Sequence, residues 1–197
     1  VKPPVSGLDG FAENEHVRLE LARAVGLPSA SSCVRRFGSE VAIVVERFDR
    51  VWVDDPNSRT PIVRVHQEDL CQALCIPPVS KYQNEGGPGP HDVVQLLRRH
   101  SSRPVHDVAL FVDALLFNWL IGGTDAHAKN YSLLIGTGGK VRLAPLYDLA
   151  SATPYTDLDP RRIQSAMKIG GQYRLYEIRS RQWRELADLL ELSLIHI

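Results

Sequence analysis

Apolar residues recur at helical spacing in several segments of the chain. Val17, Leu21 and Val25 lie one helical turn apart, which predicts a helix over residues 13–25 that ends at Gly26. The same spacing predicts further helices over residues 68–74, 91–100, 105–121 and 176–190, the last one preceded by the pair Gly170-Gly171. The segment 105–121 is strongly apolar, so we expect it at the centre of its lobe.

Shorter apolar runs bounded by turn residues predict strands. The run 41–45 is apolar without alternation, as in a strand buried on both faces. The predicted strands cover residues 32–36, 41–48, 131–135 and 140–143, with turns at 38–39 and 136–139 and the end of another strand at residues 1–4. Residues 49–61 and 77–90 are rich in Pro, Gly, Asn or Asp, which predicts loops. Helices and strands together indicate an α+β protein.

Composition narrows the function classes. The chain has 197 residues, enough for one well-cored domain or two small lobes, and its 44% hydrophobic and 23% charged content is typical of a globular protein. Lys plus Arg and Asp plus Glu are 23 each, so no overall basic field points to nucleic acid. Local arginine clusters, such as Arg98-Arg99, are interpreted as solvated helix faces and loop ends.

The cysteines bear on whether the chain binds a metal, and the cysteines and apolar runs bear on the cellular compartment. Cys71 and Cys75 lie one helical turn apart and could form half a metal site, but no second Cys/His pair at zinc-site spacing completes it. We therefore favour a buried helix face for this pair. Three cysteines without a signal peptide, and no uninterrupted apolar run of membrane-spanning length, lead us to expect a reduced, cytoplasmic protein without a membrane partner.

Features at both ends of the chain predict that it is a fragment of a longer protein. Residue 1 is Val and enters in mid-strand, so we expect the chain to be truncated there. The last six residues, 192–197, match a translation of the transposon end sequence used in sequencing libraries, and we expect them not to be native.

The segment 118–148 holds the main candidate chemistry. Asp125 is followed five residues later by Asn130, and Asp148 comes after the predicted hairpin. One carboxylate can orient a hydroxyl, while an amide oxygen and a second carboxylate hold Mg²⁺ against phosphates, and the D-x-x-x-x-N spacing also occurs in the protein-kinase catalytic loop. Asp125 could instead only cap a turn. Asp148 lies in an apolar setting that would disfavour an unpaired carboxylate, so a metal or a cation should accompany it.

Neighbouring residues leave more than one role open. His127 could touch a phosphate, act as an acid–base or merely pack, and Lys129 could neutralise developing charge or be solvated. Near the N-terminus, Lys2 at a strand end and Glu15 in the next helix have the order of the kinase pair in which a Lys grips the phosphates and a Glu holds the Lys. The run 46–48 ends the buried strand where kinases place their adenine-binding hinge.

These residues stand within a longer pattern that resembles the HipA family, bacterial serine/threonine kinases that act as toxins of toxin–antitoxin modules. The resemblance covers residues 1–191. It is carried by Asn14-Glu15, Leu21-Ala22, Gly26-Leu27, Val45–Arg50, His66–Gln72, Lys81-Tyr82, Gly86–Gly89, Trp119–Gly122, Thr124–Asn130 and Leu143–Asp148.

The resemblance implies a bilobal protein-kinase-like (HipA-like) fold, with a partial small lobe (residues 1–50, including the hinge) and a mainly helical large lobe (51–191). It implies ATP and Mg²⁺ as cofactors. The implied roles are Asp125 as catalytic base, Asn130 and Asp148 as Mg²⁺ ligands, and Lys2, Glu46, Phe48, Gln67, His127 and Tyr147 as nucleotide contacts.

The resemblance also implies partners and a limitation. It implies that the kinase phosphorylates translation proteins such as an aminoacyl-tRNA synthetase. It also implies that a HipB-like helix-turn-helix antitoxin neutralises the kinase, and that the kinase reaches DNA only through that antitoxin. The family's N-terminal subdomain and its phosphate-binding loop, which bears a regulatory autophosphorylated Ser, lie upstream of Val1, so we expect the parent protein to be active and the fragment not.

Two alternatives from other classes stay open. The first is a nucleotide- or antitoxin-binding module without catalysis. The second is a metal-dependent hydrolase that uses Asp125, His127 and Asp148, although no further His/Asp cluster completes a two-metal site.

Overall fold

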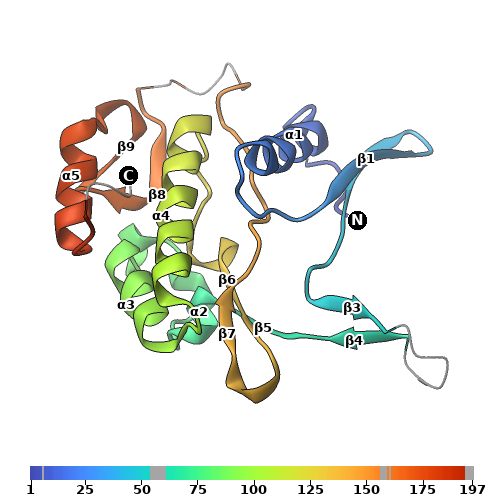
Figure 1. Ribbon diagram of the computed structural model, residues 1–197. Coiled ribbons are helices and arrows are strands. Elements are labelled where there is room, and N and C mark those ends of the chain that lie inside the picture. The colour runs from blue at the N-terminus through green and yellow to red at the C-terminus, as the bar shows by residue number, and fades with distance from the viewer. Residues whose placement is uncertain (6, 54–60, 156–158, 160, 194–197) are drawn as a thin grey trace.

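A computed structural model describes residues 1–5, 7–53, 61–155, 159 and 161–193. Helix α4 runs through the middle of the molecule, with α5, α3 and the β8–β9 hairpin on one side and α1 on the other (Figure 1). Two hairpins, β1–β2 and β3–β4, extend beyond α1 and away from α5. The mixture of helices and antiparallel sheets confirms the α+β prediction.

Helix α1 and the first hairpin form one end of the molecule. α1 spans Phe11–Ala24, β1 spans Ser32–Phe37 and β2 spans Glu40–Val45. As predicted, the helix ends before Gly26, which has a φ of 89° that favours glycine. Lys2 forms an isolated antiparallel bridge with Ile43, and its amide donates to the Ile43 carbonyl at 2.9 Å. The N-terminal segment therefore borders β2, close to the predicted strand end.

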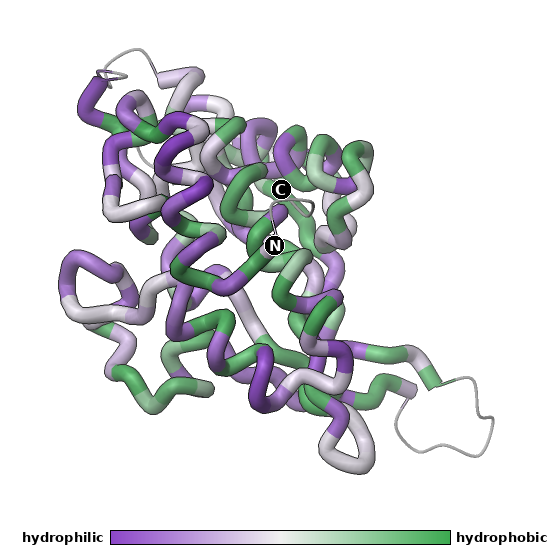
Figure 2. Tube along the Cα trace, turned by 60° about the vertical axis from the view of Figure 1, so that its left-hand side comes forward, coloured by the Kyte–Doolittle hydropathy of each residue, from purple (hydrophilic) through white to green (hydrophobic). Residues whose placement is uncertain are grey.

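The second hairpin corrects the expected loop over residues 49–61. β3 (Arg50–Trp52) pairs antiparallel with β4 (Ile62–Arg64), and residues 54–60 of the predicted loop lie outside the described residues. Trp52 is 73% exposed, and the tube of this hairpin is partly green, or hydrophobic, in Figure 2. The expectation for residues 41–45 was only partly right, because Ala42 and Ile43 alone are buried in β2.

A three-stranded antiparallel sheet in the order β5-β6-β7 follows. β5 is His66–Asp69, β6 is Ser132–Ile135 and β7 is Val141–Leu143, so the predicted β6–β7 hairpin is confirmed, with the 3₁₀ turn η4 (Thr137–Gly139) between its strands. Strand β5 was missed. The helix predicted over 68–74 is shorter, α2 (Leu70–Ala73), because Glu68 and Asp69 pair with β6 and Asp69 then caps the helix through a reciprocal pair of hydrogen bonds with Gln72.

Two helices contribute many of the buried core residues. α3 is Pro90–His100 and α4 is Pro104–Ile121, each within one residue of its predicted start. Phe111, Leu115 and Ile121 of α4 are buried, as expected of a central helix. Within the described residues α4 is long and apolar enough to cross a membrane, but 56% of it is buried inside the structure, as in a core helix. The predicted loop 77–90 contains two 3₁₀ turns, η1 (Pro78–Ser80) and η2 (Gln83–Glu85).

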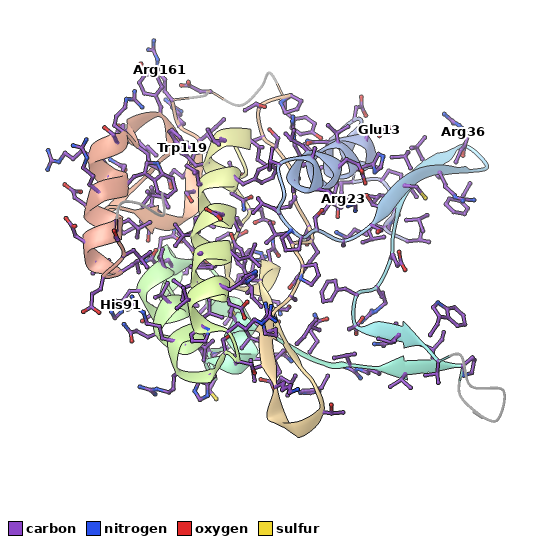
Figure 3. The ribbon with its side chains drawn as sticks, viewed as in Figure 1. Glu13, Arg23, Arg36, His91, Trp119 and Arg161 are labelled. Carbon is purple, nitrogen blue, oxygen red and sulfur yellow. The ribbon has the colours of Figure 1, made fainter. Side chains whose placement is uncertain are left out.

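The C-terminal part was predicted least well. β8 (Gln164–Ile169) and β9 (Gln172–Arg174) form a hairpin whose turn contains Gly170 and Gly171, so this glycine pair does not lead directly into a helix. The last helix, α5, spans Ser180–Leu189, and η5 (Leu175–Glu177) takes up the start of the predicted 176–190 segment. Trp119 of α4 lies between α4 and α5 (Figure 3), its ring centroid 5.8 Å from that of Trp183.

The cysteine and tail predictions meet mixed outcomes. Cys71 is buried, as expected, but Cys75 is exposed with a φ of 56°, so the two do not share a buried helix face. No group of three His, Cys, Asp or Glu side chains suited to a metal occurs among the described residues. Leu192 packs partly buried against the core, whereas residues 194–197 lie outside the described residues, so the origin of the tail stays a prediction.

Candidate active site

A tight turn after α4 delivers the acid and amide motif. Gly122 has a φ of 69°, and a Cβ added at Gly123 would lie 2.5 Å from the Asn118 Oδ1. The backbone at Gly122 therefore favours glycine, and a larger residue at 123 would have to displace the Asn118 side chain. The chain then passes through Asp125 and His127 into the 3₁₀ turn η3 (Ala128–Asn130) and on to β6.

Asp125 presents its carboxylate at the surface. Its side chain is 64% exposed, and its Oδ1 accepts a hydrogen bond from the hydroxyl of Tyr82. The Nε2 of His127 lies 3.8 Å from the same oxygen. Burial lowers the pKa of His127, against the opposing effect of the Asp125 charge, so His127 is largely neutral at pH 7.

Asn130 is bound to the backbone of the same turn. It is 8% exposed, its Nδ2 donates to the Asp125 carbonyl at 2.6 Å, and its amide donates to the His127 carbonyl at 2.9 Å. Because the side-chain nitrogen Nδ2 is used to hold the turn, the side-chain oxygen Oδ1 is the atom available as a metal ligand.

Asp148 pairs with a cation, but its side chain is 44% exposed and does not lie in the apolar setting that the sequence predicted. The ammonium of Lys2 pairs with Asp148 Oδ1 and also with Glu15 Oε1 at 2.7 Å. Burial would lower the pKa of Lys2, but its hydrogen bonds to Asp148 and Glu15 outweigh that effect and raise it, so Lys2 stays charged. Burial raises the pKa of the Glu15 carboxyl against the opposing effect of Lys2. The predicted Lys2–Glu15 pair is therefore present, and Lys2 bridges it to Asp148.

The other predicted contacts gather around Tyr147. The rings of Phe48 and Tyr147 have centroids 5.5 Å apart. Gln67 Nε2 donates to Ser132 Oγ at 3.2 Å, and Ser132 Oγ lies 2.6 Å from the Tyr147 hydroxyl, which donates to the Lys129 carbonyl at 2.7 Å. Burial raises the pKa of Tyr147, which therefore stays protonated.

Two further residues complete the comparison with the sequence predictions. Glu46 follows β2 with an exposed side chain, and its amide donates to the Ser31 carbonyl at 2.8 Å. The ammonium of Lys129, for which two roles were weighed, pairs with Asp69 Oδ2 at 2.6 Å. That ion pair ties the Asp125–Asn130 turn to the start of α2.

Sequence reasoning missed Tyr82 and Asp69. Tyr82 contacts Asp125 by a hydrogen bond and His127 by an edge-on ring contact with centroids 5.0 Å apart. The signal was present, because Lys81-Tyr82 belongs to the motifs quoted above, but the loop assignment gave the phenol no partner. Only the folded structure shows that residues 43 positions apart meet.

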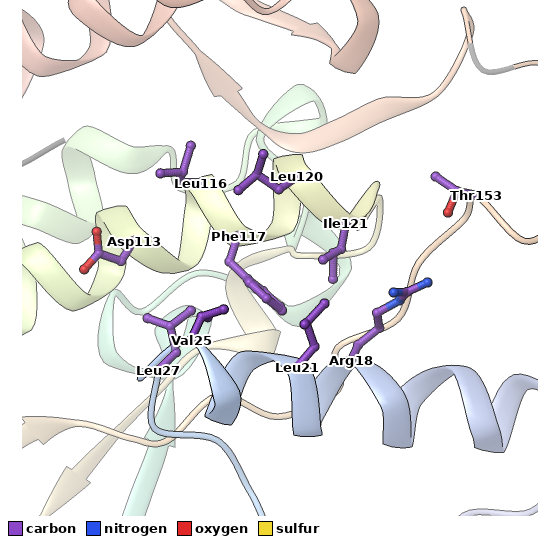
Figure 4. A pocket seen from close by; sticks show the side chains of 10 residues that line it. All are labelled: Arg18, Leu21, Val25, Leu27, Asp113, Leu116, Phe117, Leu120, Ile121 and Thr153. Carbon is purple, nitrogen blue, oxygen red and sulfur yellow. The ribbon is translucent and has the colours of Figure 1, made fainter.

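The acid pair lines one of the pockets among the described residues. A pocket of about 330 Å³ is lined by Asp125 and Asp148 together with Phe11, Ser151 and Tyr155. A larger cavity of about 570 Å³ lies between α1 and α4 (Figure 4), and its walls are mostly apolar side chains such as those of Leu21 and Phe117. The smaller pocket is the candidate site, because it holds the acid pair.

The donor set suits Mg²⁺ bound together with phosphates. Asp148 and Asn130 offer one carboxylate and one amide oxygen, and Mg²⁺ commonly takes one or two protein oxygens with substrate phosphates and waters. The described residues hold no cluster that would suit a two-metal hydrolase. The arrangement therefore places an exposed carboxylate near oxygen donors that could hold a hard cation and near a charged lysine.

Comparisons with known proteins identify the family. The family model of the HipA-like C-terminal domain matches residues 1–195. "Putative kinase Y4mE" from Sinorhizobium fredii is 43% identical over 187 residues, which cover 95% of this chain and 43% of that protein. The serine/threonine-protein kinase toxin HipA from Shewanella oneidensis is 33% identical over 171 residues, 81% of this chain and 38% of that protein.

Solved structures give the same result. The complex of Shewanella oneidensis HipA, HipB and operator DNA matches with a TM-score of 0.84 and 29% identity, covering 95% of this chain and 45% of that one. The Helicobacter pylori proinflammatory kinase CtkA shares the fold alone, with a TM-score of 0.63 and 13% identity over 98% of this chain and 81% of that one.

Fold and site together define a kinase-like α+β protein. The chain belongs to the HipA family, as a HipA-like C-terminal domain. It spans less than half the length of the two curated relatives described above.

Proposed function

We propose that the protein is a Mg²⁺- and ATP-dependent serine/threonine protein kinase of the HipA toxin type. The observation that carries the proposal is the ion-pair chain Glu15–Lys2–Asp148, in which residues 146 positions apart in sequence meet beside the Asp125 pocket. In this proposal Lys2 binds the nucleotide phosphates and Glu15 orients Lys2, as in the kinase pair.

The remaining residues have complementary roles in the proposal. Asp125 accepts the proton of the substrate hydroxyl as that oxygen attacks the γ-phosphorus and ADP leaves. Asn130 and Asp148 hold Mg²⁺, which when bound neutralises the charge of the β- and γ-phosphates. Both are fixed before substrate binds, Asn130 by its bond to the Asp125 carbonyl and Asp148 by Lys2.

The nucleotide contacts follow from the cluster around Tyr147. We assign the adenine to the hinge residues Glu46 and Phe48, since Phe48 packs against the Tyr147 ring at the end of the small lobe. Gln67, His127 and Tyr147 are assigned to the rest of the nucleotide. A neutral His127 can donate to phosphate through Nε2 without carrying a charge.

Partners are proposed by analogy with the relatives. The matched HipA is solved with HipB and operator DNA, so a HipB-like antitoxin with a helix-turn-helix fold is proposed, with DNA contacted only through it. A translation protein such as an aminoacyl-tRNA synthetase is proposed as the phosphorylated target, in the cytoplasm. These assignments rest on family membership and not on the site geometry.

The direct test is Asp125→Asn in the full-length gene product. The amide keeps the size of the side chain but cannot accept the hydroxyl proton, so phosphoryl transfer from labelled ATP should fall at least about 100-fold. Growth arrest on expression should disappear as well. Unchanged phosphorylation together with unchanged growth arrest would refute the assignment.

A second function applies to the 197-residue chain itself, which covers less than half of its relatives. Such a piece can bind a nucleotide or an antitoxin without catalysis. Calorimetry with Mg-ATP should then show binding while no phosphoprotein forms. Release of phosphate from ATP without phosphoprotein would instead favour the hydrolase alternative.

A further inference from the structure

The loop at residues 77–90 enters the candidate site through Tyr82. The phenol hydroxyl donates to Asp125 Oδ1, and the ring meets the His127 ring edge-on at 79°. The contact is made to the carboxylate that the proposed function uses as the base, so its geometry depends on how firmly the loop holds Tyr82.

The loop backbone is fixed at Tyr82. The Tyr82 carbonyl accepts hydrogen bonds from the amides of Glu85 at 3.0 Å and Gly87 at 2.9 Å, and the preceding Lys81 carbonyl accepts from the amide of Ala128 at 3.2 Å. A Cβ added at Gly87 would lie 2.3 Å from the Ser80 carbonyl oxygen, so only glycine allows this close approach.

The next residue anchors the loop to the far hairpin. Gln83 Oε1 accepts from the amide of Lys168 in β8 at 2.7 Å. A Cβ at Gly89 would lie 2.3 Å from Gln83 Nε2, so the glycine leaves room for this side chain. Tyr82 therefore reaches Asp125 from a loop that is bound on both sides of it.

We propose that Tyr82 is a positioning residue for phosphoryl transfer, which holds Oδ1 of Asp125 so that Oδ2 receives the proton of the substrate hydroxyl. The inference rests on the proposed function. In the reaction a bond forms between the substrate oxygen and the γ-phosphorus, the bond to the bridging oxygen of ADP breaks, and the hydroxyl proton moves to Asp125. Tyr82 itself exchanges no atom with the substrate.

The chemistry of the phenol supports a lasting donor role. Burial and the neighbouring Asp125 raise the pKa of Tyr82 to about 12, so the hydroxyl keeps its proton throughout the physiological range. Without this donor, the exposed Asp125 carboxylate could rotate among positions of similar energy, and fewer molecules would present an oxygen in line with the substrate.

The test compares Tyr82→Phe with wild type in the full-length gene product, using labelled ATP and a pool of serine- and threonine-containing peptides. Phe keeps the ring contact with His127 and removes only the hydroxyl. We expect kcat to fall about tenfold while the KM for ATP stays within twofold, because the lost interaction orients a base and not the nucleotide. Tyr173→Phe in β9 is the matched control and should behave as wild type.

Three outcomes overturn the inference. They are a kcat for Tyr82→Phe within twofold of wild type, a changed KM for ATP with unchanged kcat, and a faster release of phosphate to water, which would make the hydroxyl a block and not a positioner.

A readout independent of activity separates this inference from the proposed function. With ¹³Cζ-tyrosine labelling, Asp125→Asn should shift the Tyr82 resonance and lower the pKa of its phenol, since the carboxylate contributes to raising it. An inactive wild type that shows this shift would reject the kinase and keep the Tyr82–Asp125 contact. An active wild type without the shift would reject the contact.

Discussion

At the scale of single residues, unusual backbone marks the site. Asp148 has a φ of 58°, a conformation that L-residues adopt rarely and that Asp and Asn tolerate best. The left-handed turn presents its carboxylate to Lys2. The sequence predicted a metal or a cation beside Asp148 because of an apolar setting. The structure places Lys2 there although the Asp148 side chain is exposed, and the positive φ could not be read from the sequence.

Asp148→Asn should separate metal-dependent from metal-independent nucleotide binding. Asn tolerates the same backbone conformation, so the fold should hold, with a melting temperature within a few degrees of wild type. Affinity for ATP with Mg²⁺ should fall at least about tenfold, because a carboxylate ligand is lost. Affinity for ATP without Mg²⁺ should hold or rise, because a negative charge is removed beside the phosphates. Calorimetry in magnesium and in EDTA measures both, with the exposed Asp159→Asn as control; an equal loss in both buffers would contradict the role of Asp148 as a metal ligand.

At the scale of elements, one buried carboxylate joins the start of α4 to β7. Asp107 has a fully buried side chain and accepts hydrogen bonds from Arg142, from the Ser101 hydroxyl and from the Leu143 amide. Burial alone would raise the pKa of Asp107, but these donors together outweigh it and hold the pKa below its ordinary value. A shift in this direction makes the contact a source of stability at neutral pH.

Asp107→Asn should therefore cost about 2–4 kcal/mol of unfolding free energy at pH 7, because it leaves Arg142 without its partner. The sign follows from the lowered pKa. The contribution of Asp107 is fully present above the ordinary Asp pKa and is lost as pH falls through the lowered value in the folded state. The difference between variant and wild type should be constant from pH 7 to about pH 5 and shrink below about pH 4. Urea unfolding across this range measures it, with the exposed Asp188→Asn on α5 as control.

Gly170→Ala tests the packing of the β8–β9 turn on α5. A Cβ at Gly170 would lie 2.2 Å from the Gln182 carbonyl oxygen, whereas none of the described atoms lies within 4 Å of a Cβ at Gly171. Both glycines have positive φ, 53° and 78°, so both changes share the backbone strain of about 1–2 kcal/mol. Only Gly170→Ala adds a clash with backbone, and it should destabilise the protein by at least about 1 kcal/mol more than Gly171→Ala. Equal melting temperatures for the two variants would show that α5 shifts to accommodate the added methyl group without loss of stability.

The elements that the sequence predicted best are those with long, local signals. Helices α3 and α4 start within one residue of their predicted positions, because α3 has an apolar face along its 11 residues and α4 is strongly apolar over 18 residues. Strands β3, β4 and β9 have only three residues each, and their pairing depends on partners elsewhere in the chain. A pattern so short does not by itself separate a strand from a loop; β7 is equally short and was predicted because the glycine-rich turn 136–139 joins it to β6.

At the scale of the whole molecule, the site exists because distant segments meet. Asp125 and Asn130 are close in sequence, and their contact could be predicted from spacing. Lys2 and Asp148 are 146 positions apart, and the sequence predicted a partner for each of them but not their contact with one another. Tyr82 had no predicted partner, since neither periodicity nor spacing indicates where a loop folds back.

The joint between α1 and the large lobe is where this long-range order can be tested. Asn14 of α1 is buried, its Nδ2 donates to the Ser151 carbonyl at 2.7 Å, and its Oδ1 accepts from the Ser151 amide at 3.1 Å. Ser151 lies three residues after Asp148, and Glu15 follows Asn14 directly. The same joint therefore sets the distance between the two carboxylates that Lys2 bridges.

Asn14→Ala should affect stability and nucleotide binding together. It leaves a buried backbone amide and carbonyl of Ser151 without their partners, which should cost about 2–4 kcal/mol of unfolding free energy. Because the joint also aligns Glu15 with Asp148, affinity for Mg-ATP should fall by more than the unfolded fraction explains. Glu13→Ala is the matched control, since Glu13 is exposed on the same turn of α1 (Figure 3). Urea unfolding and calorimetry on the same samples measure both effects; a destabilised variant with wild-type affinity would mean that the ion-pair chain is aligned from elsewhere, and that the joint only holds the two lobes together.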